Sequence, residues 1–341
     1  MTESTAQNEP STHEPSTRAD QSQRPIEVDV KATETDSAYG NEFSVYSASL
    51  TSSVLDYRHE NGRRYHGYRD GSYLLPNDDK ESDRLDMIHE MTLTVMERKL
   101  FLAPIGPSPQ RVIDLGTGTG IWAIDFADQY PSAEVIGVDL SPTQPSMVPP
   151  NLRFLVDDIE AEWAYESPFD FIHARYLAYS IKDFKKLLKQ CFKYTKPGGW
   201  VEFQDWDSMM RSEDGSTKGS HIERYSKEVL SAFEKAGYPT QPGPNLEQWF
   251  REAGFVDIHV QKYRIPMGPW PKDPYYKKIG TWNLLQGEPG FESAAIAVLT
   301  RFESWSPEEV KVLAAQALND VKNPKIHPLY DYYVVYGRKP E

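Results

Sequence analysis

The stretch Val112-Ile-Asp-Leu-Gly-Thr-Gly-Thr-Gly120 decides the fold of this chain. An apolar run leads into three glycines at alternate positions. A second apolar run, Val135-Ile-Gly-Val-Asp139, ends in a carboxylate nineteen residues after the last glycine. A strand, a glycine turn, a helix and a second strand that ends in an acid together build a nucleotide site at the carboxyl edge of a parallel sheet. The stretch therefore predicts an α/β fold whose ligand lies at the tips of the first two strands.

The glycine spacing discriminates between the ligands that such a turn can hold. The dinucleotide fingerprint requires glycine at its sixth position, where this chain has Ile121, and a P-loop requires Gly-Lys where it has Ile121-Trp122. The spacing Gly116-x-Gly118-x-Gly120 instead matches the loop that holds S-adenosylmethionine (SAM), because glycine lets the backbone approach the amino-acid part and the ribose. A plain βα turn in another doubly wound protein is the alternative explanation.

The overall composition restricts the class of partner. The chain has 341 residues, of which 39% are hydrophobic and 26% are charged, which suffices for one large domain with a substantial core. Its net charge of -14 disfavours a nucleic-acid-binding surface, because such surfaces are basic. A small molecule or a protein is therefore the expected partner.

The sequence lacks the residues and segments that disulfides, metal sites and membrane spans require. Cys191 is the only cysteine, so neither an internal disulfide nor a cysteine zinc site is expected. The eight histidines are scattered and include no helical His-x-x-x-His pair, so we expect no metal site. No apolar run has the length of a membrane span, and the N-terminus lacks the apolar stretch of a signal peptide. We therefore expect no membrane association and a cytoplasmic location, with the nucleus left open.

Apolar runs and helical patterns alternate along the chain. The expected strands are residues 111–115, 134–139, 151–156, 169–174, 200–204, 254–263 and 330–337. The expected helices between them are residues 121–130, 182–194, 222–236 and 245–253. This alternation predicts a Rossmann-like α/β fold with a seven-stranded, mostly parallel sheet and helices on both faces. Helical patterns at 290–302 and 306–321 predict a lid insertion over about 265–325, because a structureless loop of that length would be unusual.

Composition also divides the chain before the first strand. Residues 1–40 contain almost no large apolar side chains and are expected to be a disordered tail. Residues 41–108 are expected to form a helical N-terminal flap, with its helix at 82–101. Residues 109–341 are then the core with its lid.

Three side chains of the N-terminal flap have open interpretations. Tyr65 and His66 either lie at the tip of a flap over the ligand or help to pin an irregular, tyrosine-rich segment to the core. His89 falls on the apolar face of the expected helix, where a histidine is more often a packing residue with satisfied hydrogen bonds than a catalytic one.

Several segments together resemble one family. The run Asp114-Leu-Gly-Thr-Gly-Thr-Gly-Ile-Trp122 with Asp139-Leu-Ser-Pro142 is similar to the class I SAM-dependent methyltransferases. The wider set resembles the fungal LaeA-like methyltransferases, which include velvet-complex regulators and enzymes of secondary metabolism. Its segments, within about residues 40–260, are Glu60-Asn-Gly-Arg-Arg-Tyr-His66, Leu75-Pro-Asn-Asp-Asp79, Arg84-Leu-Asp86 with His89, Asn151-Leu-Arg-Phe154, Phe169-Asp-Phe-Ile-His-Ala-Arg175 and Pro197-Gly-Gly-Trp-Val-Glu202.

The resemblance implies a class I methyltransferase fold, SAM as cofactor and a role for each residue of its site. Gly116, Gly118 and Gly120 would let the methionine part approach the loop, and Asp114 would help to fix its amino group. Asp139 would accept both ribose hydroxyls, a task that suits a carboxylate.

The adenine end is expected to lie after the third strand. Asp158 would accept from the adenine amino group and Ile159 would pack on the ring, with Asp157 as a neighbour that could exchange roles with Asp158. A simple turn residue after a strand is the alternative for Asp158.

Methyl transfer from a sulfonium requires mainly alignment and the exclusion of water. A base helps if the acceptor is a hydroxyl or an amine. His173 is the candidate base by its intrinsic pKa, although it could equally serve a structural hydrogen bond. Arg175 and Tyr176, which follow the same strand, are expected at the acceptor pocket, where Tyr176 would either shape the pocket or pack.

These features leave two functions open. The first is a SAM-dependent methyltransferase that modifies a small molecule in secondary metabolism. The second is a regulator of the LaeA type that acts through a protein complex with a partner of the velvet kind. A nicotinamide-dependent dehydrogenase is disfavoured by the glycine spacing.

Overall fold

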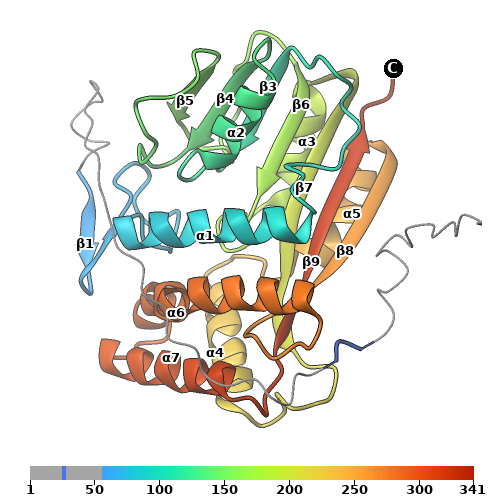
Figure 1. Cartoon of the computed structure of the whole chain (residues 1–341). Helices are drawn as coiled ribbons and strands as arrows, with labels where there is room; N and C mark the ends of the chain where they lie inside the picture. The colour runs from blue at the N-terminus through green and yellow to red at the C-terminus, as the bar shows by residue number, and fades with distance from the viewer. Residues whose placement is uncertain (1–24, 28–55) are drawn as a thin grey trace, which may run out of the picture.

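A seven-stranded sheet forms the centre of the molecule (Figure 1), in a computed structural model that describes residues 25–27 and 56–341. The strand order is β5-β4-β3-β6-β7-β9-β8, and β9 pairs antiparallel with both of its neighbours while the remaining pairs are parallel. The strands are β3 (Arg111–Leu115), β4 (Glu134–Asp139), β5 (Leu152–Val156), β6 (Phe169–Arg175), β7 (Thr195–Arg211), β8 (Val256–Pro266) and β9 (Leu329–Arg338). The predicted fold class is confirmed. The chain order reverses between β3 and β6, so a crevice opens at their carboxyl ends.

Helices cover both faces of this sheet. Neighbouring apolar side chains of a strand point to opposite faces, so each face needs helices to bury it. Val112 packs toward α2 (Ile121–Gln129), whereas Ile113 packs toward α3 (Phe184–Tyr194) and α5 (Pro242–Ala253). On the α2 face, α1 (Asp79–Val95) lies across β7 and β9, where Ile88, Met91 and Val95 meet Tyr332 and Val334. The predicted helices on both faces are thus present, with the ligand edge left open.

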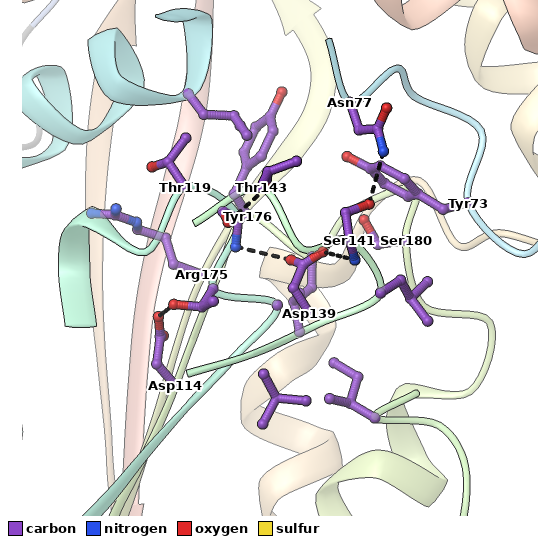
Figure 2. Close-up of a pocket in the computed structure, with 18 of the residues that line it drawn as sticks. Tyr73, Asn77, Asp114, Thr119, Asp139, Ser141, Thr143, Arg175, Tyr176 and Ser180 are labelled. Atoms are coloured by element: carbon purple, nitrogen blue, oxygen red, sulfur yellow. Dashed lines mark hydrogen bonds between the residues drawn. The ribbon is translucent and has the colours of Figure 1, made fainter. Parts of the chain in front are cut away.

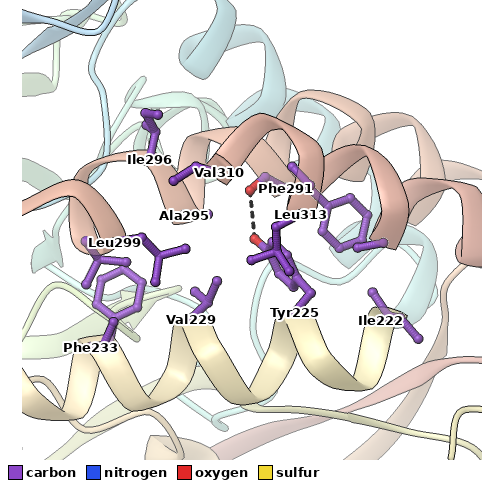
Figure 3. Close-up of a cluster of buried hydrophobic side chains, with 14 of the residues drawn as sticks. Ile222, Tyr225, Val229, Phe233, Phe291, Ala295, Ile296, Leu299, Val310 and Leu313 are labelled. Atoms are coloured by element: carbon purple, nitrogen blue, oxygen red, sulfur yellow. Dashed lines mark hydrogen bonds between the residues drawn. The ribbon is translucent and has the colours of Figure 1, made fainter. Parts of the chain in front are cut away.

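The predicted lid is a helical layer below the sheet in Figure 1. The predicted range 265–325 contains α6 (Pro274–Phe302) and α7 (Pro307–Lys322). α4 (His221–Lys235), which lies outside that range, shares one apolar cluster with them. Figure 3 shows Tyr225, Val229 and Phe233 of α4 facing the other two helices. α6 begins sixteen residues before the predicted 290–302, because Gly280, Gly287 and Pro289 give its first half a low helix propensity.

Two boundaries differ from the sequence prediction for local reasons. α1 starts at Asp79 because the Asp78 side chain accepts from the backbone N–H of Glu81, and it stops at Val95 because Glu97 and Arg98 have positive φ angles. β7 continues past the predicted 200–204 to Arg211, because β9 pairs with it over this whole length. The extension places Trp206, Ser208 and Met210 in the helical layer.

The N-terminal flap contains a two-stranded hairpin, β1 (Arg58–Glu60) and β2 (Arg63–Tyr65). Of the predicted tail 1–40, only residues 25–27 are described, and Ile26 packs there against Trp270 and Leu329. The rest of that tail and residues 41–55 lie outside the described residues. Within the described part, no helix is long and apolar enough to cross a membrane, and no group of acidic, histidine or cysteine side chains is arranged to hold a metal ion.

Candidate active site

The glycine turn after β3 has the backbone that its sequence predicts. Gly116, Gly118 and Gly120 all have positive φ angles, which side chains disfavour. Gly116 and Gly118 line a cavity at the carboxyl edge of the sheet, and an added Cβ on Gly116 would come within 2.6 Å of Leu177. Gly120 does not line it: an added Cβ there would come within 2.4 Å of Phe154. Its role is therefore close packing at the start of α2 rather than contact with a ligand.

This cavity, here called the donor cavity, has a volume of about 1290 Å³ counted out to its open mouth. It lies where β3, β4, β5 and β6 end, and the N-terminal flap closes it from the other side through Tyr73 and Asn77 (Figure 2). Asn77 donates to the Ser141 hydroxyl at 3.1 Å, which joins the flap to the loop after β4. The cavity is thus held between the sheet edge and a segment far away in the sequence.

Asp139 lies at the centre of the donor cavity, as Figure 2 shows. One carboxylate oxygen accepts from the Gly118 N–H and the other from the Ser141 N–H, each at 2.9 Å. These bonds fix the carboxylate while each oxygen keeps a lone pair that can accept a further hydrogen bond. Burial raises the pKa of Asp139 to about 6, and the nearby Asp114 carboxylate adds to the rise.

Asp114 and His173 form a buried pair below Asp139. The imidazole Nδ1 donates to one Asp114 oxygen at 2.7 Å, and the Thr117 hydroxyl donates to the other at 2.6 Å. The ring of His173 stacks on Trp122 with centroids 3.7 Å apart. Burial lowers the pKa of His173, so the ring is neutral at pH 7 and its Nε2 carries a free lone pair. His173 lines the donor cavity, but its Nε2 is itself buried, so the ring is better suited to position Asp114 than to act as a base on a substrate.

The loop after β5 contains the two predicted acids. Asp158 and Ile159 line the donor cavity, and one Asp158 oxygen accepts from the Glu160 N–H while the other lies 3.6 Å from Arg69 Nε of the flap. Asp157 is exposed, and its side chain accepts from the Asp158 N–H. Both acids line the donor cavity, and Asp158 is the less exposed of the two.

Comparison with known proteins shows the family of this chain. A family model described as a methyltransferase domain matches residues 87–260. The chain is 42% identical to methyltransferase pytC of Aspergillus terreus, over 92% of this chain and 95% of that protein. It is 36% identical to the secondary metabolism regulator LAE1 of Cochliobolus heterostrophus (83% and 94% covered) and 35% identical to the secondary metabolism regulator laeA of Aspergillus flavus (86% and 80%).

The chain belongs to the fungal LaeA-like methyltransferase family. It is a methyltransferase with SAM as its cofactor, in agreement with its glycine turn and the acid after β4.

Tyr65 and His66 of this LaeA-like chain are not at the tip of the flap. Both are buried, and the tip is the turn at Asn61 and Gly62. Arg301 of α6 lies over the Tyr65 ring at 4.8 Å. The Tyr65 ring contacts the helical layer through Arg301, whereas His66 contacts Arg69 and Ser72 of its own segment. Both residues therefore hold the segment in place, which is the second of the two interpretations. The sequence could not distinguish them because both expect aromatic residues near a glycine turn.

Arg175 and Tyr176 both line the donor cavity. Arg175 contacts His89 Nδ1 at 3.0 Å, and His89 Nε2 contacts Asp125 at 3.0 Å, so His89 is a packing residue with satisfied hydrogen bonds as predicted. Tyr176 has a φ of 60°, a strained backbone for a tyrosine, and its N–H donates to the Gln204 carbonyl. Strain of this kind is found where a side chain must be held in one position, and here Tyr176 is held at the inner end of the cavity.

A second cavity, the inner cavity, continues from this point and was not foreseen from the sequence. Its volume is about 710 Å³ counted out to its mouth, and it shares Ile88 and Tyr176 with the donor cavity. Arg84 lies in its wall, ion-paired with Glu81 at 2.5 Å, and both side chains are only 2% exposed. Arg84 also donates to the Tyr176 hydroxyl and to Gln286 of α6. The motif Arg84-Leu-Asp86 was the one sequence signal for this cluster.

The pKa of Asp139 predicts how cofactor affinity depends on pH. Since burial raises this pKa to about 6, protonation below about pH 6 removes the charged acceptor for the ribose hydroxyls. We expect the Kd of S-adenosylhomocysteine (SAH) to be constant above pH 7 and to rise about tenfold per pH unit below pH 6. Calorimetric titration between pH 5 and pH 8 measures this. The Asp139→Asn variant should show weak, pH-independent binding, and a flat wild-type profile would contradict the assignment.

A second prediction separates the two roles of His173. His173→Phe keeps the stack on Trp122 but removes the hydrogen bond to Asp114. If His173 positions Asp114, we expect the Kd of SAM to rise about tenfold, since a buried acceptor is left unpaired. If His173 is a base instead, the same variant should leave the Kd of SAM unchanged and slow the methyl-transfer step. Titration together with single-turnover kinetics decides between the two roles.

Proposed function

We propose that this methyltransferase transfers the methyl group of SAM to a small molecule bound in the inner cavity. The observation that carries the proposal is the junction of the two cavities at Tyr176, since a donor in the first and an acceptor in the second would meet there. In-line transfer requires donor and acceptor to be aligned and water to be kept out.

The roles of the SAM-site residues are part of this proposal. Asp139 binds the ribose, Asp114 with its partner His173 fixes the amino group, and Asp158 with Ile159 holds the adenine. Gly116 and Gly118 allow the methionine part to approach the backbone. Because His173 is buried, its ring does not take a proton from the acceptor. An acceptor that needs deprotonation would lose its proton to solvent or to another group within the acceptor itself.

A regulatory function is the second candidate, favoured by the relatives at 35–36% identity that carry the name of secondary metabolism regulators. In that case the acceptor would be a protein or the chain would act within a complex of the velvet kind. Both functions suit the cytoplasm or the nucleus. The inner cavity is recessed between α1, α4, α6 and the sheet, which supports the small-molecule function better, because a protein substrate needs an open groove.

Deletion of the gene followed by metabolite profiling tests the proposal. Loss of one methylated compound, with accumulation of its unmethylated precursor, is the expected result. Purified protein with SAM and that precursor should then form SAH. Broad loss of many unrelated compounds, together with capture of a stable protein partner, would favour the regulator instead.

A further inference from the structure

The walls of the inner cavity indicate what kind of acceptor it binds. Most of its lining is aromatic or aliphatic: Ile88, Tyr176, Tyr179, Trp206, Met210, Tyr225, Val229, Leu230, Met267, Phe291, Ala294 and Tyr330. Figure 3 shows Tyr225, Val229 and Phe291 turned toward one another between α4 and α6. Such walls favour a flat, largely apolar ligand.

The charge in this cavity is already balanced. Arg84 is its one lining residue with a formal charge, and Glu81 neutralises it through two hydrogen bonds, at 2.5 and 3.0 Å. An anionic acceptor would have to compete with Glu81 for the guanidinium. A cationic acceptor would lie next to Arg84. An uncharged acceptor avoids both costs.

Most other polar groups of the wall have partners within the protein. The Tyr225 hydroxyl donates to the Phe291 carbonyl at 2.7 Å, and the Ser226 hydroxyl donates to the Ile222 carbonyl at 3.0 Å. The side-chain amide of Asn283 donates to the Pro266 carbonyl at 2.9 Å. These groups are satisfied and leave little demand for a ligand.

Two buried groups of the wall are not satisfied. The indole Nε1 of Trp206 and the hydroxyl of Ser208, both from the extension of β7, have no hydrogen-bond partner in the described part of the chain. The Ser208 hydroxyl lies near the Tyr179 hydroxyl and reduces the rise in the Tyr179 pKa that burial causes. No hydrogen bond of normal geometry joins the two oxygens. Trp206 is the clearer case, because an indole N–H can only donate and an unpaired buried donor is costly.

Trp206 also lies close to the point of transfer. Its ring is 6.1 Å from that of Tyr176, the residue shared by the two cavities. An oxygen held by Trp206 and the atom that receives the methyl group would therefore lie at the same end of the acceptor.

We propose that the acceptor is an uncharged, largely apolar ring compound with a carbonyl oxygen that accepts a hydrogen bond from Trp206 Nε1. The proposal rests on the small-molecule function above and specifies the class of substrate. It assigns Trp206 as a residue that binds and orients the acceptor.

A fluorescent ketone tests this assignment. The probe is 6-propionyl-2-(dimethylamino)naphthalene, an uncharged ring ketone whose emission reports the polarity around its carbonyl, titrated into the full chain saturated with SAH. We expect blue-shifted emission on binding and at least about tenfold weaker binding of 2-(dimethylamino)naphthalene, which lacks the carbonyl. Trp206→Phe should weaken binding of the ketone about tenfold and leave binding of the second compound unchanged.

Matched variants and a charged probe make the test decisive. Trp249→Phe, on α5 against Phe184, should change nothing. Ala294→Phe narrows the inner cavity without touching the donor cavity, so it should abolish probe binding and leave SAH binding intact. Two results with the wild-type protein overturn the proposal even if Trp206→Phe fails to fold. One is equal binding of the ketone and of 2-(dimethylamino)naphthalene, and the other is tighter binding of 2-naphthylmethylammonium than of the ketone. If wild type binds SAH but not the ketone, only this inference fails; if it does not bind SAH, the proposed function fails with it.

Discussion

Asp139→Ala is expected to weaken SAM binding by at least about 100-fold. Each hydrogen bond to a charged partner contributes about 1.5–3 kcal/mol, and the ribose would lose two of them. The backbone N–H groups of Gly118 and Ser141 would also lose their acceptor, so the glycine turn would be less well fixed. Calorimetric titration with SAM measures the change in Kd.

The same substitution should leave the protein folded. Because burial raises the pKa of Asp139 to about 6, holding it charged in the folded protein at pH 7 costs stability relative to the unfolded chain. Its removal relieves this cost, which offsets the two lost backbone hydrogen bonds. Asp128→Ala, an exposed carboxylate on α2, is the control and should change neither affinity nor the unfolding temperature. Unaltered SAM affinity in Asp139→Ala would show that the ribose is held elsewhere.

Glu81→Gln is expected to lower the free energy of unfolding by about 3–5 kcal/mol, because it leaves the Arg84 cation buried without its counter-charge. The remaining contacts of Arg84, to Tyr176 and Gln286, are to uncharged groups. Since this cluster forms the wall between the donor and inner cavities, we also expect slower methyl transfer. Denaturant unfolding monitored by circular dichroism gives the stability change.

A matched control lies on the same helix. Glu90→Gln breaks an ion pair with Arg98 whose side chains are 42% and 63% exposed, and it should cost less than about 1 kcal/mol. The double variant Glu81→Gln/Arg84→Met removes both buried charges and should recover much of the lost stability. A double variant no more stable than Glu81→Gln would show that packing of the Arg84 side chain, rather than its charge, is what matters.

The donor cavity could be predicted from the sequence because its parts are local. The apolar run before Gly116, the turn itself and the acid at Asp139 specify a strand, a turn and a second strand whatever surrounds them. Asp158 and Ile159 follow for the same reason, since they come directly after β5. The strands from β3 to β6 are short and largely apolar, so a mostly parallel sheet could be inferred from their alternation with helices.

The sequence determined the fold class, the cofactor and the edge of the sheet where it binds, because each depends on neighbouring residues and on backbone geometry. Tertiary contacts alone decided the rest. Pairing with β9 extends β7 far enough to deliver Trp206, and packing on α1 and α4 makes one helix of residues 274–302 despite Pro289. Segments more than a hundred residues apart therefore build the inner cavity, and no local pattern records which of their side chains will meet.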